Sequence, residues 1–576
     1  MPEVSPSEPF ASPYVPKPDS LRDTIESVVI AFIFAFVFRA FVVEAFVIPT
    51  GSMAPTLYGL HGQHRCASCN YPYAYGLRED TRPQFAPKPL NLPCPNCSWD
   101  GAGNDGDDAI PDANADAGDR ILVLKWPYDI GGSLLQPQRW DVVVFKDPQD
   151  GVTNFIKRLI GLPGEVLEII DGDIYTCPAS SLSQGLVAEL SKKRPPYQNG
   201  SDPQYQHLTD AHFRELNEKL TIARKTRVAQ DSLWLIHYDH DYPPSRDDRL
   251  IGGDPSWNPP RFVPRSLGDS SPWRTDSPRI SFNPIDGEPH SVRLEGQPIQ
   301  DRYGYNPPIQ KTGPESVNVG DVRLRFLLTP RGKEGHFAMT LAKGEEVFRA
   351  TLQPDGQVIL DKILSDSVPV RQAVAKIDPF ESGKPVEVSF CNLDYRIALT
   401  IDGKEVVATR DNQYQPDLKS LRKQSDGKAS QARIEMAAQN WPLELQHVAV
   451  DRDVYYRSTR DAMGSPVMTQ PNGAQFHPWG NLPGWATTNH PILLREKPGD
   501  YFCCGDNSPQ SKDGRMWVDI APMLATREGA EAYQLGTVPA DQMIGRAFFV
   551  YWPSGFKVFS SRVGVIPNVG RMRIIR

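Results

Sequence analysis

A long apolar run near the N-terminus constrains the fold of this chain more than any other feature of its sequence. From Ile25 the run reads IESVVIAFIFAFVFRAFVVEAFVIP, and its second half carries the charged residues Arg39 and Glu44. A helix needs about 20 apolar residues to cross a bilayer, and a long side chain near its end can reach the headgroups. We therefore expect one transmembrane anchor at 21–48.

A cleaved secretory signal and a buried core helix are the alternatives for this run. A signal peptide has a shorter apolar region and a basic start, whereas acidic residues precede this one. An uncleaved anchor is therefore the favoured interpretation. Lys17 and Arg22 lie before the span, and after it the next basic residue is Arg65. The positive-inside rule then places the N-terminus in the cytoplasm and the bulk of the chain outside.

Length and charge limit the remaining possibilities. A chain of 576 residues is too long for one compact core, so two or three domains are expected. Its 55 prolines indicate long loops and few long helices. The net charge of −8, without a strongly basic stretch, argues against nucleic acid as the main partner.

Alternating apolar and polar residues predict a mainly β protein. The pattern fills 119–175 and resumes at 538–560, so the far end of the chain is expected to complete the first β domain. A second series of short strands, with an Asp402-Gly403 hairpin signal, predicts a jelly-roll-like β-sandwich at about 280–460. The expected segments are a disordered N-terminus (1–20), the anchor (21–48), a β-rich domain in three parts (49–65, 118–176 and 498–576), and two insertions (66–117 and 177–497).

Four short motifs carry the functional argument. In chain order they are TGSMAPTL (50–57), GDRILVLK (118–125), FIKRLIGLPGE (155–165) and GDNSPQSKDGR (505–515). Taken singly, each has an ordinary structural interpretation. A serine between glycine and proline is usually a turn residue, and a lysine on a strand usually faces water. Chemistry is indicated by their combination and order.

Together these motifs resemble the conserved boxes of bacterial type I signal peptidases. The serine box S-x-M-x-P-T-L follows the anchor directly, and the lysine box K-R-x-x-G-x-P-G matches fully. The last motif matches G-D-N-x-x-x-S-x-D-x-R. The resemblance covers 20–60, 118–175 and 500–555, which is under half of the chain.

The resemblance implies a serine endopeptidase with Ser52 as nucleophile and Lys157 as general base. A serine hydroxyl is a weak nucleophile until a neighbouring base takes its proton. Lysine can serve only when neutral, so its pKa must fall from about 10.4 to roughly 7–8. Burial beside Ile156 and Leu159 would lower it, because desolvation disfavours the charged form.

The same resemblance assigns supporting roles in the last motif. Ser511 is expected to hydrogen-bond Lys157 and orient it, and Asp513 and Arg515 are expected to pair and hold the loop. Gly514 stands where the family more often has serine, which makes the loop less rigid but leaves the dyad unchanged.

Further roles concern the substrate. Thr50 stands where the family has a serine whose hydroxyl helps to form the oxyanion hole, and the Ser52 N–H would be the second donor. Ile48 and Ile156 are candidates to line shallow pockets for the small side chains of an extended precursor segment. The implied partners are signal peptides of exported precursors and the membrane, with the secretion translocon as one candidate. The implied location is the inner or plasma membrane, with the catalytic domain outside the cytoplasm.

Two cysteine pairs indicate a separate small unit. Cys66-Ala-Ser-Cys69 and Cys94-Pro-Asn-Cys97 are spaced much as in a zinc ribbon. Four thiolates would close a structural Zn²⁺ site without an open position. Two disulfides are the alternative, because this unit is expected outside the cytoplasm; zinc is favoured. The resemblance implies no cofactor for catalysis.

Two other classes of function are alternatives to a serine endopeptidase. One is a membrane-tethered, lectin-like binding module on a catalytically silent peptidase scaffold, which the intact Ser52 and Lys157 argue against. The other is a zinc-dependent hydrolase, which is disfavoured because the chain has no H-E-x-x-H motif and its strong metal pattern is a closed one.

Overall fold

The computed structural model describes most of the chain, and the structural statements below concern the residues that it describes. The predicted disorder at 1–20 lies outside them. The described residues are 21–77, 92–99, 116–130, 135–192, 208–244, 257–265, 271–306, 316–364, 368–458, 468–469, 475–476, 484–529, 532–554 and 567–575.

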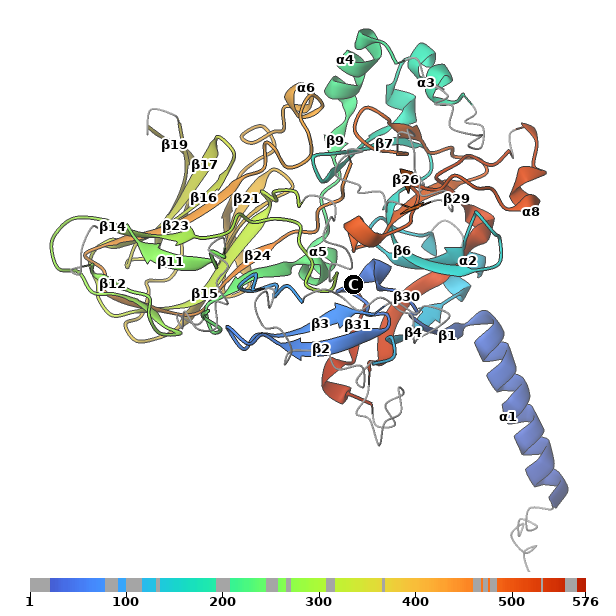
Figure 1. Cartoon of the computed structure of the whole chain (residues 1–576), viewed down its shortest axis with the longest axis horizontal. Coiled ribbons are helices and arrows are strands. Elements are labelled where there is room, and N and C mark those ends of the chain that lie inside the picture. The colour runs from blue at the N-terminus through green and yellow to red at the C-terminus, as the bar shows by residue number, and fades with distance from the viewer. Residues whose placement is uncertain are drawn as a thin grey trace, which may run out of the picture.

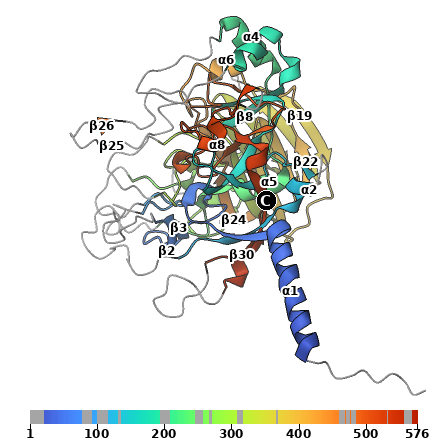
Figure 2. The ribbon, with the colours of Figure 1, turned by 90° about the vertical axis from the view of Figure 1, so that its right-hand side faces the viewer.

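The protein is mainly β, with one apolar helix at its N-terminal side. Helix α1 (Leu21–Phe41) projects away from the body of the molecule (Figures 1 and 2). Its segment Asp23–Phe41 has a mean hydropathy of 2.0 and is not buried by the rest of the protein. In the described part of the chain it is the one helix long and apolar enough to cross a membrane.

The helix is shorter than the expected span of 21–48. Strand β1 (Val43–Val47) follows it and pairs antiparallel with β4 (Arg120–Leu124). The β4 side also supplies Lys125, whose Nζ donates to the Glu44 carboxylate at 3.3 Å. A short apolar run is compatible with either a lipid-exposed helix or a strand. Here the last part of the run, Val43–Val47, forms a strand because it pairs with the edge of β4.

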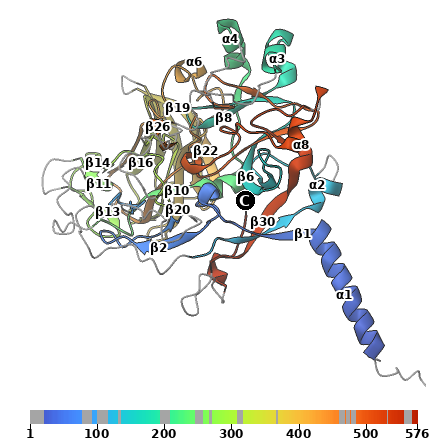
Figure 3. The same cartoon turned by 45° about the vertical axis from the view of Figure 1, so that its right-hand side comes forward.

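The four sequence motifs all lie on or beside one eight-stranded sheet. Its order is β1-β4-β30-β5-β6-β28-β29, with β31 paired to β30. From the far end of the chain, β30 therefore lies between β4 and β5 (Figure 3), and β28 and β29 extend the sheet beyond β6. The strands not yet given are β5 (Val142–Lys146), β6 (Asn154–Gly161), β28 (Asp500–Cys504), β29 (Val538–Pro539), β30 (Met543–Trp552) and β31 (Arg573–Ile574).

Apolar side chains cover both faces of this sheet. Along β5, Val142 and Val144 join one buried cluster, and Val143 and Phe145 join another on the opposite face. The first cluster also contains Met53 from the serine motif. The serine turn is therefore fixed by core packing on the sheet that carries the lysine.

A four-stranded sheet is the base from which the long insertion leaves and to which it returns. Its order is β27-β7-β8-β9, so the chain departs after β8 and comes back at β27 in the same sheet. The bounds are β7 (Glu165–Ile170), β8 (Asp173–Pro178), β9 (Thr221–Ile222) and β27 (Ile492–Leu493).

The insertion contains two large antiparallel sheets, which we call the two-sheet unit. One runs β12-β13-β24-β15-β20-β21-β22, with β10 paired to β24, and the other runs β11-β14-β23-β16-β17-β18-β19. The first comprises β10 (Leu235–Asp239), β12 (Trp273–Arg274), β13 (Ile280–Phe282), β15 (Val322–Pro330), β20 (Val386–Leu393), β21 (Arg396–Ile401), β22 (Lys404–Ala408) and β24 (Leu443–Arg452). The second comprises β11 (Arg261–Pro264), β14 (His290–Glu295), β16 (His336–Lys343), β17 (Glu346–Leu352), β18 (Gln357–Ile363), β19 (Pro369–Lys376) and β23 (Ala432–Gln439).

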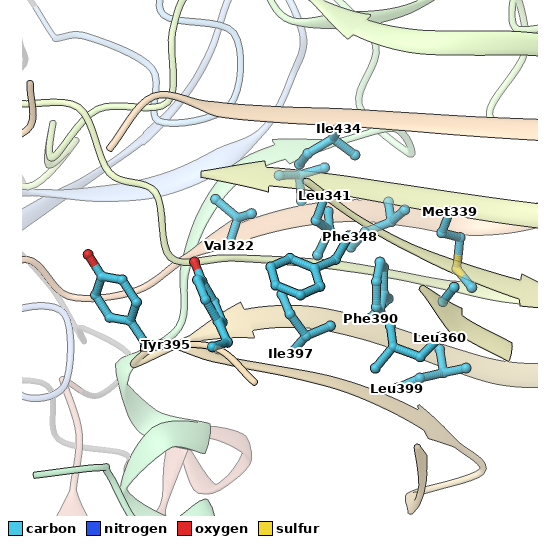
Figure 4. Packing of buried hydrophobic residues seen from close by; sticks show 14 of the residues in the cluster. Val322, Met339, Leu341, Phe348, Leu360, Phe390, Tyr395, Ile397, Leu399 and Ile434 are labelled. Atoms are coloured by element: carbon cyan, nitrogen blue, oxygen red, sulfur yellow. The ribbon is translucent and has the colours of Figure 1, made fainter. Parts of the chain in front are cut away.

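The two sheets share one apolar core. Phe390 and Leu399 from the first sheet meet Leu341, Phe348 and Leu360 from the second, all of them fully buried (Figure 4). The unit begins earlier than the expected 280–460, because β10 pairs with β24.

The predicted hairpin between β21 and β22 is confirmed. Asp402 and Gly403 join the paired strands with φ values of 45° and 74°. Two successive residues with positive φ are what a two-residue type I′ turn requires, and the Asp-Gly pair tolerates them.

Short elements complete the fold. They are η1 (Gly51–Met53), β2 (His61–Arg65), β3 (Pro72–Gly76), α2 (Trp126–Ile130), η4 (Ala179–Ser181), α3 (Gln184–Leu190), α4 (Asp210–Lys219), α5 (Arg227–Leu233), α6 (Leu418–Leu421), β25 (Met468–Thr469), β26 (Gln475–Phe476), η5 (Ser508–Gln510), α8 (Pro522–Ala525), η7 (Ala540–Gln542) and η8 (Val569–Arg571).

Two truncations test where the anchor ends and the folded body begins. A chain that starts at Val42 should unfold at the same urea concentration as the full chain in detergent, because α1 is not buried against the body. A chain that starts at Ile48 also loses β1 and its ladder with β4. At about 1 kcal/mol per hydrogen bond, we expect its free energy of unfolding to fall by about 2–4 kcal/mol. Equal midpoints for the two truncations would contradict the assignment of β1 to the sheet.

Candidate active site

Ser52 lies in a tight turn directly after β1. The turn is the single 3-10 turn η1, and the buried side chains of Met53 and Leu57 pack it onto the sheet. Ser52 itself is half-buried, so its hydroxyl is anchored but not sealed from a substrate. Thr50 precedes the turn in an extended conformation, and its exposed side chain makes no capping hydrogen bond.

Lys157 on β6 brings its amine to the serine hydroxyl. Nζ lies 2.8 Å from Ser52 Oγ and donates to the Ile156 carbonyl at 3.1 Å. Nζ also lies 5.1 Å from the centre of the Phe155 ring. The lysine is only 4% exposed, so bulk water does not solvate its amine.

Burial lowers the pKa of Lys157 from its ordinary value of 10.5. Among the acidic groups near the amine that oppose this shift, Asp513 comes first and the thiols of Cys503 and Cys504 follow. Burial raises the pKa of both thiols, so they are uncharged at neutral pH. Asp513 is therefore the foremost charged group that favours the ammonium form.

Asp513 is itself neutralised by a buried ion pair. Its carboxylate accepts hydrogen bonds from Arg515 at 2.9 and 2.8 Å and from the Gly505 N–H at 2.9 Å. Burial alone would raise the pKa of Asp513, but the Arg515 guanidinium together with the hydrogen bonds to the carboxylate lowers the pKa below its ordinary value. The two residues that the last motif was expected to pair thus form a charge-compensated support behind the lysine.

Ser511 differs from its expected arrangement. Its Oγ is buried and makes no hydrogen bond to Lys157; its hydroxyl instead helps to lower the pKa of the Asp513 carboxyl. The second hydrogen bond of the lysine amine goes instead to the backbone carbonyl of Ile156. Gly505 lies between the two serines, and a Cβ there would collide with both the Ser511 hydroxyl and the Ser52 carbonyl. Glycine is therefore required for the loop to approach the nucleophile this closely.

Asn507 and Asp506 of the last motif hold the serine turn and β6 in place through hydrogen bonds that the sequence did not indicate. The Asn507 N–H donates to the Ser52 carbonyl at 3.0 Å, and its side-chain Nδ2 donates to the Gly51 carbonyl at 2.9 Å. Asp506 accepts two hydrogen bonds of 2.7 Å from the buried Arg158, the residue after Lys157. Their place in the G-D-N triplet next to the expected support residues was the one signal that could have singled them out.

The expected substrate-pocket residues have different surroundings. Ile48 is 2% exposed and belongs to the buried cluster that holds the serine turn. Ile156 is half-buried at the margin of the same cluster. In this structure Ile156 therefore offers more surface to a substrate than Ile48 does.

The four cysteines of the CxxC pairs form a compact, buried group. Their sulfur atoms all lie within 4.8 Å of one another, with Cys66–Cys97 at 3.5 Å and Cys69–Cys94 at 3.6 Å. A disulfide needs about 2.05 Å, whereas sulfurs around a tetrahedral zinc are about 3.8 Å apart for Zn–S bonds of about 2.3 Å. The donor set therefore fits a zinc ion.

Removing one partner of the Asp513–Arg515 pair should be costly. Arg515→Met leaves the Asp513 carboxylate buried without its counter-charge, which typically costs about 3–5 kcal/mol of unfolding free energy. Arg527→Met is the matched control, because its partner Asp541 is 55% exposed; surface pairs contribute less than about 1 kcal/mol. Urea denaturation of both variants gives the comparison, and equal losses would show that Asp513 does not depend on Arg515.

Comparison with known proteins bears on the identity of the chain. The sequence model described as "Signal peptidase, peptidase S26" matches 110–258 and 396–552, more than half of the chain. These ranges include Lys157 and the last motif, whereas Ser52 precedes them.

Curated relatives match over shorter stretches. Signal peptidase I of Pseudomonas fluorescens is 32% identical over 162 residues, which are 26% of this chain and 53% of that protein. Signal peptidase I of Rickettsia typhi is 52% identical over 40 residues, 7% of this chain and 15% of that protein. The chain thus spans about half the length of the Pseudomonas relative, and less of the other.

Solved structures match about a third of the chain only loosely. A carbohydrate binding module (CBM66) from Bacillus subtilis aligns with 33% of this chain and 94% of its own length, at 11% identity and a TM-score of 0.22. The Caenorhabditis elegans galectin LEC-6 aligns with 30% and 92%, at 14% identity and a TM-score of 0.16. Scores this low carry no functional argument.

The family model matches more than half of the chain, which shows that the chain belongs to the signal peptidase family, peptidase S26.

Proposed function

We propose that this protein is a membrane-anchored serine endopeptidase that cleaves signal peptides from exported precursors with a Ser52–Lys157 dyad. The observation that carries the proposal is the 2.8 Å separation of Lys157 Nζ and Ser52 Oγ. The amine is buried and its pKa is lowered, which favours the neutral form whose lone pair takes the serine proton. Family membership supports the substrate class.

The reaction begins with nucleophilic attack by the serine. Ser52 Oγ bonds to the carbonyl carbon of the scissile peptide while its proton passes to Lys157 Nζ. When the tetrahedral intermediate collapses, the C–N bond breaks and the ammonium of Lys157 returns the proton to the leaving amine. A water molecule then attacks the acyl ester. Lys157 accepts the proton of that water and passes it back to Ser52 as the signal peptide leaves with a new carboxylate.

The developing negative charge on the carbonyl oxygen needs hydrogen-bond donors. The Ser52 N–H and the Thr50 hydroxyl are the proposed donors, and the absence of a capping bond leaves the Thr50 side chain free to turn toward a substrate. Loss of one such donor typically costs about 3–4 kcal/mol of transition-state stabilisation.

Other groups support the dyad without touching the reacting atoms. Asp513 and Arg515 hold the loop behind Lys157, and Ser511 contributes a buried hydroxyl beside Gly505. Ile156, with Ile48 behind it, is proposed to line the pocket for a small side chain before the cut.

The membrane role rests on α1. Its exposed apolar surface suits a lipid environment, and the strand that follows it carries the chain straight into the serine turn. We propose an inner- or plasma-membrane protein with a cytoplasmic N-terminus and the catalytic domain outside, near the translocon that delivers its substrates. A signal peptide that is held in the bilayer would present its cleavage site close to this surface.

The insertions have structural assignments in this proposal. The two-sheet unit is a β-sandwich of jelly-roll type within 177–497, and the unit around Cys66–Cys97 is a zinc-ribbon-like insertion. Cys66, Cys69, Cys94 and Cys97 would hold one Zn²⁺, which closes the fold and supplies no catalytic chemistry. Asn96 supports this assignment, since its Nδ2 donates to Cys69 Sγ at 3.5 Å and to the Tyr242 carbonyl at 2.8 Å.

Replacement of the lysine tests the dyad. Purified protein in detergent should cleave a precursor with small residues before the cut, and Lys157→Met should abolish this, because no lone pair remains to take the serine proton. The wild-type rate should rise with pH and reach a plateau, since the amine is protonated and inactive below its lowered pKa. The inflection is expected below 10.5.

Stability supplies the matched check on the same variant. Between the lowered folded pKa and the ordinary unfolded pKa of Lys157, the unfolded chain binds a proton that the folded chain does not, so folding is weakened as the pH falls through this interval. Lys157→Met removes that penalty and should unfold at an equal or higher temperature. Lys146→Met on β5, whose amine donates to the Val152 carbonyl, should leave turnover unchanged. Near-full turnover by Lys157→Met would show that another base acts.

Metal analysis tests the cysteine unit. Elemental analysis of the purified chain should find about one zinc per molecule, and Cys66→Ser should lose it. Cys391→Ser, a cysteine on β20 outside the group, should retain it. Absence of zinc together with absence of free thiols in this unit would favour two disulfides instead.

A further inference from the structure

A short segment of the insertion reaches back to the serine turn. Its first residue, Asp301, is fixed by a buried ion pair with Arg457 at 2.6 Å. The Tyr303 hydroxyl then donates to the Asp506 carbonyl at 2.8 Å. The segment 301–306 therefore packs on the loop that contacts the nucleophile, although it belongs to the chain between strands of the two-sheet unit.

Asn306, at the end of this segment, forms a reciprocal amide pair with Asn507. Asn306 Nδ2 donates to Asn507 Oδ1 at 2.6 Å, and Asn507 Nδ2 donates to Asn306 Oδ1 at 2.7 Å. Asn507 Nδ2 donates its other hydrogen to the Gly51 carbonyl at 2.9 Å. Asn507 is fully buried, so its amide plane is set by these partners and not by water.

The carbonyl held by Asn507 belongs to the peptide unit that carries the proposed oxyanion donor. Gly51 C=O and Ser52 N–H share one planar trans peptide, so they point in opposite directions. Fixing the Gly51 oxygen therefore fixes the direction of the Ser52 N–H. Hydrogen bonding at the carbonyl also polarises the same peptide, which strengthens its N–H as a donor.

Tyr305 closes the other side of this peptide. Its ring lies so near Gly51 that a Cβ there would collide with it. The ring stacks on Tyr58 at 5.6 Å and 17°, and its hydroxyl donates to the Leu60 carbonyl at 3.2 Å. The Gly51–Ser52 peptide thus lies between a rigid aromatic wall and the Asn507 amide.

We infer that Asn306 is a positioning residue for catalysis, which acts through Asn507 to orient the Ser52 N–H toward the oxyanion. The inference rests on the proposed peptidase function. It assigns the insertion a direct part in building the active site, because the residue that completes this hydrogen-bond chain comes from the insertion and not from any of the four motifs.

Kinetics of Asn306→Ala with a precursor substrate test the inference. Because the donor is misdirected but not removed, kcat should fall about tenfold, less than the 10²–10³-fold typical when an oxyanion donor is lost. KM should stay within about twofold, and the pH inflection set by Lys157 should not move. Asn318→Ala is the matched control, an asparagine of the same insertion whose side chain accepts from Gln300, and its kcat should equal that of the wild type.

A double-mutant cycle separates positioning from a purely structural effect. If Asn306 acts through Asn507, then Asn306→Ala added to Asn507→Ala should lower kcat no further. The inference would be overturned if the losses in kcat of the two single variants multiplied in the double variant. It would also be overturned if Asn306→Ala left kcat unchanged, or raised KM while kcat stayed normal. A loss that disappears when the assay is run well below the unfolding temperature of the variant would overturn it as well. Failure of the wild type to cleave any precursor would instead refute the proposed function.

Discussion

An uncharged lysine amine inside the protein is the condition on which this active site depends. Burial of Lys157 disfavours its ammonium form, but a carboxylate nearby would restore it, and Asp513 is such a carboxylate. The pairing of Asp513 with Arg515 opposes that field with a positive charge and keeps the loop in place. The neighbouring thiols of Cys503 and Cys504 add no charge at neutral pH, because burial raises their pKa values. The Lys157 amine therefore lies beside a carboxylate that is paired with a guanidinium and beside two thiols that are uncharged at neutral pH.

The same loop organises the other half of the dyad. Asp506 is fixed by Arg158, the neighbour of Lys157 on β6, and Asn507 binds both carbonyls that flank the Ser52 N–H. One loop therefore carries the support for the base on one side and for the nucleophile on the other. A displacement of this loop would change the direction of the serine peptide and the distance to the amine together.

The sequence predicted the parts whose signals are local, and it failed where contacts are made between distant segments. The resemblance of the motifs to signal peptidase boxes implied that Ser52 and Lys157 are partners, and Asp402-Gly403 marked a hairpin because both residue types tolerate positive φ. The end of the anchor could not be found, because Val43–Val47 is as apolar in a strand as in a helix and its state depends on pairing with β4. Asn306 carries no recognisable pattern, and only folding brings it beside Asn507, about 200 positions away. Ser511 is the opposite case: the resemblance implied a bond to Lys157, but the Ile156 carbonyl takes that place.

Chain topology explains how so large an insertion is compatible with the catalytic sheet. The insertion leaves after β8 and returns at β27, and both strands belong to the sheet that contains β7. The turn between β7 and β8 is itself held by the insertion, since Asp171 accepts hydrogen bonds from the Gly427 N–H, the Ser430 hydroxyl and the Tyr455 hydroxyl.

Beside that turn, lysines of the insertion meet buried carboxylates. Lys343 lies 2.7 Å from Asp321 and 3.6 Å from Asp173, so it bridges the insertion and the β7–β8 hairpin. Separating buried charges that are paired in this way would leave each of them unpaired, which costs free energy, so the pairs fix the relative position of the two segments. The insertion is therefore fixed to the sheet at its base and again at the serine turn through 301–306. A unit that is attached at two places, one of them beside the Gly51–Ser52 peptide, cannot move independently of the proposed Ser52–Lys157 dyad.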